Sequence, residues 1–597
     1  MTKEAASGLD PITVEIIRHQ LLSATREMST NLTRTAYSTI IYELNDFGVS
    51  IYDPQARLVA EDVGITFFTR ANDFALRSIL DFLGPDKLED GDAIILNYPY
   101  WSSAHTLDVA VCSPVFAQGT LVGLTAVRTH WLDLKQKDPG YCLDTTDMHQ
   151  EGIVFPASKI YKRGELNEDV HNIIRFNSRM PDRVLGDMHA QVSACRIAEQ
   201  RVREIVERFG VDTYQAATVQ IMDHGERLAR QRLATLPKGT WSAEDYVDGD
   251  GVVDELVKMK ATVTISDDEM VVDWTGSHPT TKGPINLPEG QTIGLSGVIF
   301  KCLTSPETSA NDGDFRPLRV IVPEETFLHA TPPDPTFTLW PGLLAGEVIL
   351  KALAKGMPDR VPACSGGDVC SMMGLGVFPR SGRRWLEATN EGVGFGGHVG
   401  GDGENGIMHL TEPGCRSNPV EALETKTPMF IEHYGLRPDS GGPGKHRGGL
   451  GISRSYRFLA DSTAAMLVYK TSTRPWGIGE GRSGDNCHVT MNPGTERERV
   501  AGGFYRPVLE GDVLENNSGG GGGWGDPFER DPLLVLADVR SGYVTLEGAR
   551  REYGVAIDIE TWTVDEVETA RLRSGERPPE PAPIGAETTG IRPLVLR

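Results

Sequence analysis

Apolar residues in the first part of the chain follow a helical period and then an alternating one. Behind Asp10-Pro11, a favourable helix start, apolar side chains recur at three- and four-residue spacing up to about Thr35. From Asp46 the period changes to two, which predicts a strand that ends at Asp53-Pro54. By the same criterion, further strands are expected over residues 93–96, 109–116 and 121–124.

The rest of the chain divides into one long helical stretch and a longer β-rich stretch. The clearest helix covers residues 183–209, and Gly210 is placed to end it. Strand-like alternation begins near residue 240 and is interrupted by a helix at 341–355. The remaining expectations are a glycine-rich loop at 363–405, short strands over 426–515, a last helix near 531–553 and an extended tail from Arg577.

These elements predict a multidomain α+β fold, with mixed sheets and long helices in the N-terminal half and a β-rich, glycine-rich C-terminal half. The 597 residues are too many for one hydrophobic core. We expect an N-terminal α/β domain at 1–240, a central α+β domain at 241–425, a β-rich domain at 426–560 and an extended tail at 561–597.

Composition and charge narrow the range of partners. A formal net charge of −24 argues against nucleic acid or an anionic membrane as a partner, because both select basic surfaces. The sequence has no run of about 20 apolar residues and no apolar signal-peptide core near Met1. Its eight cysteines form no CxxC pair, which favours reduced, buried thiols, a cytoplasmic location and no cysteine-based zinc site.

Residue types that bind metals gather between residues 97 and 152. His105 and Asp108 stand just before an apolar strand, and His130 ends the strand that returns after the Gln118-Gly119 turn. If the two strands pair as a hairpin, two imidazoles and one carboxylate converge, a ligand set that suits zinc, manganese or iron. Asp46 begins another strand and is a candidate fourth ligand, and Asp133 is placed to accept an imidazole N–H.

Spacing alone leaves other readings of these and nearby residues open. A single histidine at a strand end is more often structural than a ligand. Asp187 and Gln191, with His189 between them, share a helix face where capping or a polar surface is the simpler explanation. The glycine run 519–523 lacks the ending of a phosphate-binding loop and favours a tight turn or a mobile lid, and the basic loop 441–451 favours an exposed turn.

Ordered blocks of sequence resemble the hydantoinase B family, which includes subunits of 5-oxoprolinases, caprolactamase-type lactamases and ketone carboxylases. Together the blocks extend over most of the chain. They cover residues 45–53, 97–108, 130–133, 139–140, 151–152, 186–191, 283–286, 418–421, 437–442 and 519–527.

The resemblance implies a metal site of zinc or manganese held by Asp46, His105, Asp108 and His130. It also implies a hetero-oligomer with an actin-like, hydantoinase A-type subunit, which binds ATP with magnesium and phosphorylates the substrate's carbonyl oxygen. Three places depart from the family's pattern: Trp131 replaces the second histidine of a pair, Lys135-Gln136 replace two glycines, and Tyr98 replaces an aspartate. Trp131 and Tyr98 either line an apolar pocket or pack against the scaffold.

The expected function is therefore the metal-binding subunit of an ATP-dependent cyclic-amide hydrolase. Asp133 or Glu151 would transfer a proton while water attacks the activated substrate. The alternatives are a ketone carboxylase at the same metal site, a non-catalytic scaffold subunit, and a stand-alone non-haem iron oxygenase, whose ligands usually follow an HxD rather than an HxxD spacing. Chain length favours the hydrolase over the carboxylase.

Overall fold

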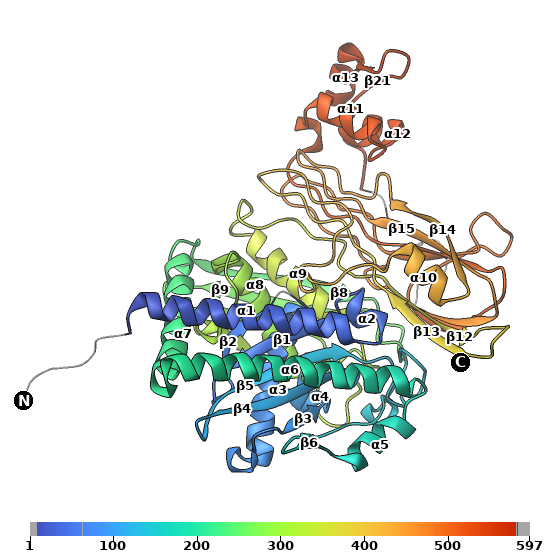
Figure 1. The fold of residues 1–597 in the computed structure, drawn as a ribbon. Helices are drawn as coiled ribbons and strands as arrows, with labels where there is room; N and C mark the ends of the chain where they lie inside the picture. Colours follow the sequence, from blue (N-terminus) through green and yellow to red (C-terminus); the bar gives the residue numbers. More distant parts are fainter. Residues whose placement is uncertain (1–8, 63, 339, 581, 583–597) are drawn as a thin grey trace, which may run out of the picture.

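The computed structural model describes residues 9–62, 64–338, 340–580 and 582. Long helices gather in the first 233 residues, and short strands dominate the second half of the chain (Figure 1). The multidomain α+β fold expected from the sequence is confirmed. Among the described helices, none has the length and apolar character needed to cross a bilayer.

A seven-stranded antiparallel sheet forms the centre of the N-terminal part. Its strands lie in the order β2-β1-β5-β4-β3-β6-β7. In chain order they are β1 (Phe47–Tyr52), β2 (Leu58–Glu61), β3 (Ala93–Leu96), β4 (Asp108–Ala117), β5 (Thr120–His130), β6 (Ser158–Lys162) and β7 (Glu165–Leu166).

Long helices cover one face of this sheet (Figure 1). Helix α1 (Pro11–Thr35) starts where the sequence predicts, because the Asp10 carboxylate accepts the free N–H groups of Ile12 and Thr13. Helix α6 (Pro181–Phe209) packs beside it, and Gly210 separates it from α7 (Val211–Leu233). The shorter helices of this part are α2 (Thr39–Tyr42), α3 (Thr66–Leu83), α4 (Pro99–Ser102) and α5 (Glu168–Phe176).

The opposite face of the sheet packs against α3 and the central part of the chain. Val109 and Val111 share one apolar core with α1 and α6, whereas Ala110 and Cys112 share another with α3. Successive strand residues point to opposite faces, so a sheet that is buried on both sides has two cores. The central elements are β8 (Gly239–Val247), β9 (Val257–Ile265), β10 (Met270–Asp273), β11 (Leu318–Ile321), α8 (Glu289–Thr304) and α9 (Trp340–Ala354).

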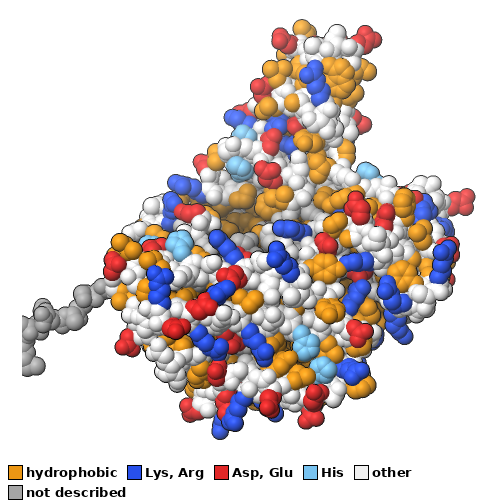
Figure 2. Space-filling view, viewed as in Figure 1, with side chains coloured by type: hydrophobic (Ala, Val, Ile, Leu, Met, Phe, Trp, Pro, Cys, Tyr) orange, Lys and Arg blue, Asp and Glu red, His pale blue; other side chains and the backbone are white. Residues whose placement is uncertain are grey.

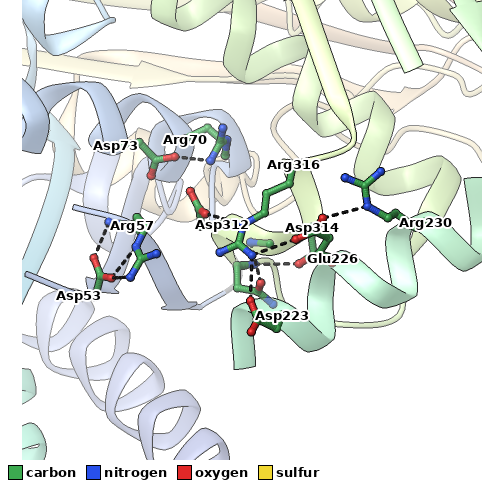
Figure 3. Close-up of polar contacts among 12 residues, drawn as sticks. Asp53, Arg57, Arg70, Asp73, Asp223, Glu226, Arg230, Asp312, Asp314 and Arg316 are labelled. Atoms are coloured by element: carbon green, nitrogen blue, oxygen red, sulfur yellow. Dashed lines mark hydrogen bonds and ion pairs between the residues drawn. The ribbon is translucent and has the colours of Figure 1, made fainter. Parts of the chain in front are cut away.

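Charged side chains line the junction between α7 and the central part. Arg316, which follows the 3₁₀ helix η3 (Asp312–Phe315), donates to Asp223 and Glu226 of α7 at 2.9 Å each (Figure 3). Partly exposed pairs of this kind contribute at most about 1 kcal/mol each, so apolar packing supplies most of the stability of this junction. On the face shown in Figure 2, acidic and basic side chains are interspersed without a large basic patch.

Two antiparallel sheets build the β-rich part. One has the strand order β13-β12-β16-β19 and the other β14-β15-β20-β17-β18. Their strands are β12 (Ser371–Val377), β13 (Arg384–Thr389), β14 (Met429–Leu436), β15 (Ile452–Phe458), β16 (Ser462–Leu467), β17 (His488–Met491), β18 (Arg499–Ala501), β19 (Phe504–Val508) and β20 (Val513–Asn517), with α10 (Val420–Lys426) beside them.

The expectation of a loop throughout residues 363–405 was wrong, because β12 and β13 pair within it. Gly374 and Gly376 lower the strand propensity of this segment, which hides the strand in the sequence. In the structure, a Cβ atom on either glycine would lie about 3 Å from the Trp385 ring, so the two glycines make room for that indole. Cross-strand packing therefore compensates for the weak local propensity.

The glycine run 519–523 is buried, so the expectation of a turn or mobile lid was also wrong. Its backbone exchanges hydrogen bonds with other glycine-rich segments, including those from Gly394 N to Gly519 O at 2.9 Å and from Gly442 N to Gly521 O at 2.7 Å. A Cβ atom on Gly521 would lie 1.9 Å from the Phe395 carbonyl oxygen. Only glycine permits extended backbones to pack this closely, as in the collagen triple helix.

The same packing overturns the expectation that residues 441–451 form an exposed turn. Arg447 is 3% exposed, and Gly448 and Gly449 are buried against the glycine-rich segments. The Arg447 guanidinium lies 3.6 Å from the Asp538 carboxylate, so this basic residue pairs within the fold.

A small module after residue 530 projects from the β-rich part (Figure 1). The single helix expected near 531–553 is two helices, α11 (Pro532–Arg540) and α12 (Leu546–Tyr553), because Gly542 turns the chain with a φ of 73°. The segment 561–597, expected to be extended, contains α13 (Glu566–Arg573). Most of the predicted tail beyond Arg577 lies outside the described residues, and the domain boundaries stay predictions.

Candidate metal centre

Three strand ends bring the predicted ligands together. Strands β4 and β5 form the expected hairpin, in a register that places Asp108 directly opposite His130. Strand β1 lies on the other side of β5, and its preceding residue, Asp46, accepts a backbone hydrogen bond from the N–H of His130 at 3.3 Å. His105 comes from the turn between α4 and β4. All four residues line one cavity.

The two imidazoles approach the same carboxylate oxygen. His105 Nε2 lies 3.3 Å and His130 Nδ1 lies 3.2 Å from Asp108 Oδ1. The two ring centroids are 4.9 Å apart, and the rings are nearly perpendicular. Phe337 stacks on the free face of His105 at a centroid distance of 5.1 Å. The rings are thus held in place by packing as well as by Asp108.

Buried polar atoms without partners show that these residues fit a cation. Asp108 Oδ2 and His130 Nε2 are shielded from solvent and have no hydrogen-bond partner among the described residues. An unpaired buried polar atom costs about 1–3 kcal/mol, and the free energy is recovered when a ligand satisfies it. Ligand atoms of His105, Asp108 and His130 lie within 4.8 Å of one another, a spacing suited to a shared metal ion.

Burial also sets the protonation of these groups. It lowers the pKa of His105 to about 3, although the nearby Asp108 carboxylate opposes the shift, so the imidazole is neutral and keeps a lone pair. Burial raises the pKa of Asp46 to about 7, an effect that the charge of His130 opposes and the charge of Asp108 increases. Burial opposes protonation of His130, but the hydrogen bond to Asp108 and the charge of Asp46 raise its pKa, so a bound cation would take the place of a proton there. Closely spaced carboxylates beside a neutral imidazole are an environment that a divalent cation stabilises.

The cavity wall contains one further carboxyl group, that of Glu412, which the sequence reasoning missed. Burial, together with the charges of Asp46 and Asp108, raises its pKa well above the usual range. The sequence carried an unused signal, because His409 stands three residues before Glu412, the spacing that also separates His105 and Asp108. In the structure, however, His409 Nε2 pairs with Glu347 at 3.1 Å.

Comparison with known proteins decides the family. The sequence model for hydantoinase B/oxoprolinase matches residues 10–527. The chain belongs to the hydantoinase B/oxoprolinase family. It is 30% identical to the caprolactamase β subunit of Pseudomonas jessenii over 581 residues, which are 92% of this chain and 97% of that protein.

A solved structure agrees with this membership of the hydantoinase B/oxoprolinase family, and a second one shares the fold. The crystal structure of the ATP-dependent caprolactamase from Pseudomonas jessenii superposes with a TM-score of 0.89 at 28% identity, covering 95% of this chain and all of the matched chain. A nucleotide-free acetone carboxylase structure gives a TM-score of 0.86, covering 95% of this chain and 83% of the matched chain. Its identity of 19% makes it a likeness of fold alone.

The structure does not bring the two predicted proton carriers to the cavity. The Asp133 carboxylate accepts from the Arg179 guanidinium at 2.6 Å and from the Arg179 backbone N–H, and it contacts neither imidazole. The Glu151 carboxylate accepts from the backbone N–H groups of Thr336 and Phe337 at 2.9 and 3.1 Å. Because Phe337 stacks on His105, Glu151 supports the imidazole from behind.

Trp131, a departure from the family's pattern, packs against the scaffold. Its indole is fully buried and donates to Gln191 Oε1 at 2.7 Å, and Gln191 Nε2 donates to the carbonyls of Val109 and Val127 at 2.9 and 3.0 Å. Asp187, one turn earlier on α6, accepts the N–H groups of Tyr37 and Ser38. The helix pair considered in the sequence is therefore structural.

Tyr98 is likewise absent from the cavity wall and packs against Tyr100 and Trp101, with ring centroids 5.1 and 5.2 Å away. Neither aromatic departure from the family's pattern thus shapes the cavity directly.

Replacing Trp131 by phenylalanine is expected to destabilise the fold and leave the substrate preference unchanged. The variant leaves Gln191 Oε1 unpaired and creates a void, which together cost about 2–4 kcal/mol. Thermal unfolding and kcat/KM for two substrates check this. Trp562, which is 39% exposed, gives the matched control Trp562→Phe. A changed ratio of kcat/KM values at unchanged stability would contradict the structural role.

Proposed function

We propose that this chain is the metal-binding catalytic subunit of an ATP-dependent cyclic-amide hydrolase. The observation that supports it most directly is the cavity in which Asp46, His105, Asp108, His130 and Glu412 converge. We propose that Asp46, His105, Asp108 and His130 hold a zinc or manganese ion. When bound, such an ion supplies Lewis acidity, which acidifies water and polarises a carbonyl-derived carbon.

The nucleotide chemistry belongs to a partner in this proposal. The named β subunit of caprolactamase implies a second subunit in that enzyme, and we propose an actin-like, hydantoinase A-type partner for this chain. The partner transfers a phosphoryl group from ATP to the amide oxygen. One water then adds to the activated carbon and the ring C–N bond breaks, and a second water releases phosphate.

Glu412 is the proton carrier in this proposal. Its carboxyl lines the cavity beside Asp46 and Asp108, so it lies near the atoms that react. Burial keeps this carboxyl protonated, and a protonated carboxyl can donate to the nitrogen that leaves when the ring opens. Asp108 and Phe337 orient the imidazoles, and Glu151 fixes Phe337.

The cavity is small, which limits how the substrate reaches it. Its volume of about 60 Å³ holds a few water molecules and not a whole cyclic amide. Tyr469 lines a larger cavity of about 240 Å³. Trp340 lines the small cavity, and its ring centroid is 6.1 Å from that of Tyr469. We propose that the substrate enters from the larger cavity when these rings move apart.

Substrate-stimulated ATP hydrolysis tests the proposed reaction. The chain, purified together with its partner subunit, is expected to hydrolyse ATP faster with a cyclic amide such as ε-caprolactam, 5-oxoproline or hydantoin, and to release the ring-opened amino acid without bicarbonate. Stimulation that needs both a ketone and bicarbonate would replace the hydrolase with a carboxylase.

A further inference from the structure

A second group of metal-ligand side chains lies behind the cavity wall. Asp368, Cys370 and Cys487 are fully buried, and their ligand atoms lie within 4.8 Å of one another. Asp368 and Cys370 precede β12, whereas Cys487 precedes β17 of the other sheet in the β-rich part. The three side chains therefore connect two sheets, and none belongs to the His105–Asp108–His130 group.

Each thiol proton already points at an oxygen. Cys370 Sγ donates to Asp368 Oδ2 at 3.5 Å, and Cys487 Sγ donates to the Gly366 carbonyl oxygen at 3.5 Å. A cation that displaces both protons meets two sulfurs and one Asp368 oxygen, which lie within 4.8 Å of one another, and the Gly366 carbonyl oxygen lies 3.5 Å from Cys487 Sγ. The Gly366 carbonyl is thus placed as a fourth donor beside the three side chains.

Backbone N–H groups stabilise the anionic forms of these ligands. Gly519 N donates to Cys487 Sγ at 3.1 Å, and Val369 N and Tyr469 N donate to the two Asp368 oxygens at 2.8 and 2.7 Å. Two thiolates and one carboxylate around a divalent ion leave one net negative charge. Three N–H donors aimed at the ligand atoms offset part of that charge, as outer hydrogen bonds do in known metal sites.

We propose that Asp368, Cys370 and Cys487 form a second, structural site for a thiophilic divalent cation, with zinc as the expected ion. Sulfur ligands select zinc over magnesium, calcium or manganese. The scattered cysteine spacing argued against a cysteine-based zinc site, but folding brings residues together that are far apart in sequence.

The ion would fasten one wall of the catalytic cavity. Val369, Ser371, Met372 and Met373, which flank or follow Cys370, all line that cavity. An ion shared with Cys487 would tie the start of β12 to the start of β17. The two sites adjoin the same wall but have no ligand in common. A variant that removes the metal from one site should therefore leave the other site occupied.

Cobalt substitution separates the two sites, because only the second contains sulfur. Metal-free protein reconstituted with Co²⁺ under reducing conditions is expected to take up two equivalents and show a sulfur-to-cobalt charge-transfer band in the near ultraviolet. The band should remain in His105→Ala/His130→Ala and disappear in Cys370→Ser/Cys487→Ser. Cys302, the exposed thiol, gives the control Cys302→Ser, which should keep the band.

Three results would overturn this site. They are a wild-type cobalt protein without the charge-transfer band, uptake of one equivalent that is lost entirely in the histidine variant, and a Cys370–Cys487 disulfide found by mass spectrometry of protein prepared under reducing conditions. The wild-type spectrum decides the question even if the double cysteine variant does not fold. The cyclic-amide reaction is assayed separately, so its failure would leave this result unchanged.

Discussion

Replacing His105 and His130 together by alanine is expected to remove one equivalent of divalent metal and to lower ring-opening turnover by at least about a hundredfold. Mutating a residue that merely orients a metal ligand lowers metal affinity or activity by about 10–100-fold. The loss of two ligands is therefore expected to lower turnover by at least the upper end of that range. Elemental analysis of the purified protein and product formation with the partner subunit measure the two effects.

The matched control is His149→Ala, because the His149 side chain is 75% exposed and lies outside the cavity. Deleting two buried rings also leaves a void, which destabilises the fold independently of the metal. A second variant that conserves side-chain volume is therefore tested together with the double alanine variant. Asp108→Asn keeps the packing and removes the carboxylate that both imidazoles approach. Metal content and turnover equal to wild type in both variants, with the fold intact, would make this subunit a scaffold.

Replacing Glu412 by glutamine is expected to lower kcat by about 10²–10⁴-fold, the range typical of a lost general acid or base. The metal content should stay at the wild-type level and KM should change little, since glutamine keeps the size of the side chain and lacks only the acidic proton. Steady-state kinetics and elemental analysis on one preparation give both values.

Glu421→Gln is the control for this variant, because Glu421 is exposed on α10, nine residues along the chain. Wild-type kcat in Glu412→Gln would remove Glu412 from the mechanism. Loss of metal together with activity would show a different role, in which Glu412 is itself a ligand.

Much of the ligand cluster follows from local sequence. The two apolar strands and the Gln118-Gly119 turn specify a hairpin, and a hairpin's register is set by its turn. That register would pair Asp108 with Thr129, and a β-bulge between Val115 and Phe116 shifts it by one residue, which places Asp108 opposite His130. The long helices were also predictable, because their apolar period and caps lie within a few residues of each other.

Side-chain direction was harder to predict from the strands. When both faces of a sheet are buried, apolar and polar residues no longer alternate, so the sequence does not show which face a residue joins. Trp131 directly follows His130, yet its indole joins the core beside Gln191 rather than the cavity. Asp133 is similarly diverted, because Arg179 from a later segment pairs with it.

The sequence by itself determined the α+β class, the family, the long helices and the hairpin of β4 and β5, whereas the bulge that sets Asp108 opposite His130 appears only in the structure. Only the tertiary structure decided that Glu412 lines their cavity, that Cys370 meets Cys487, and that the glycine run 519–523 is buried. The physical reason is the range of the interactions: periods, caps and turns act over a few residues. Contacts between distant segments depend on how whole sheets and extended backbones pack, which no local pattern records.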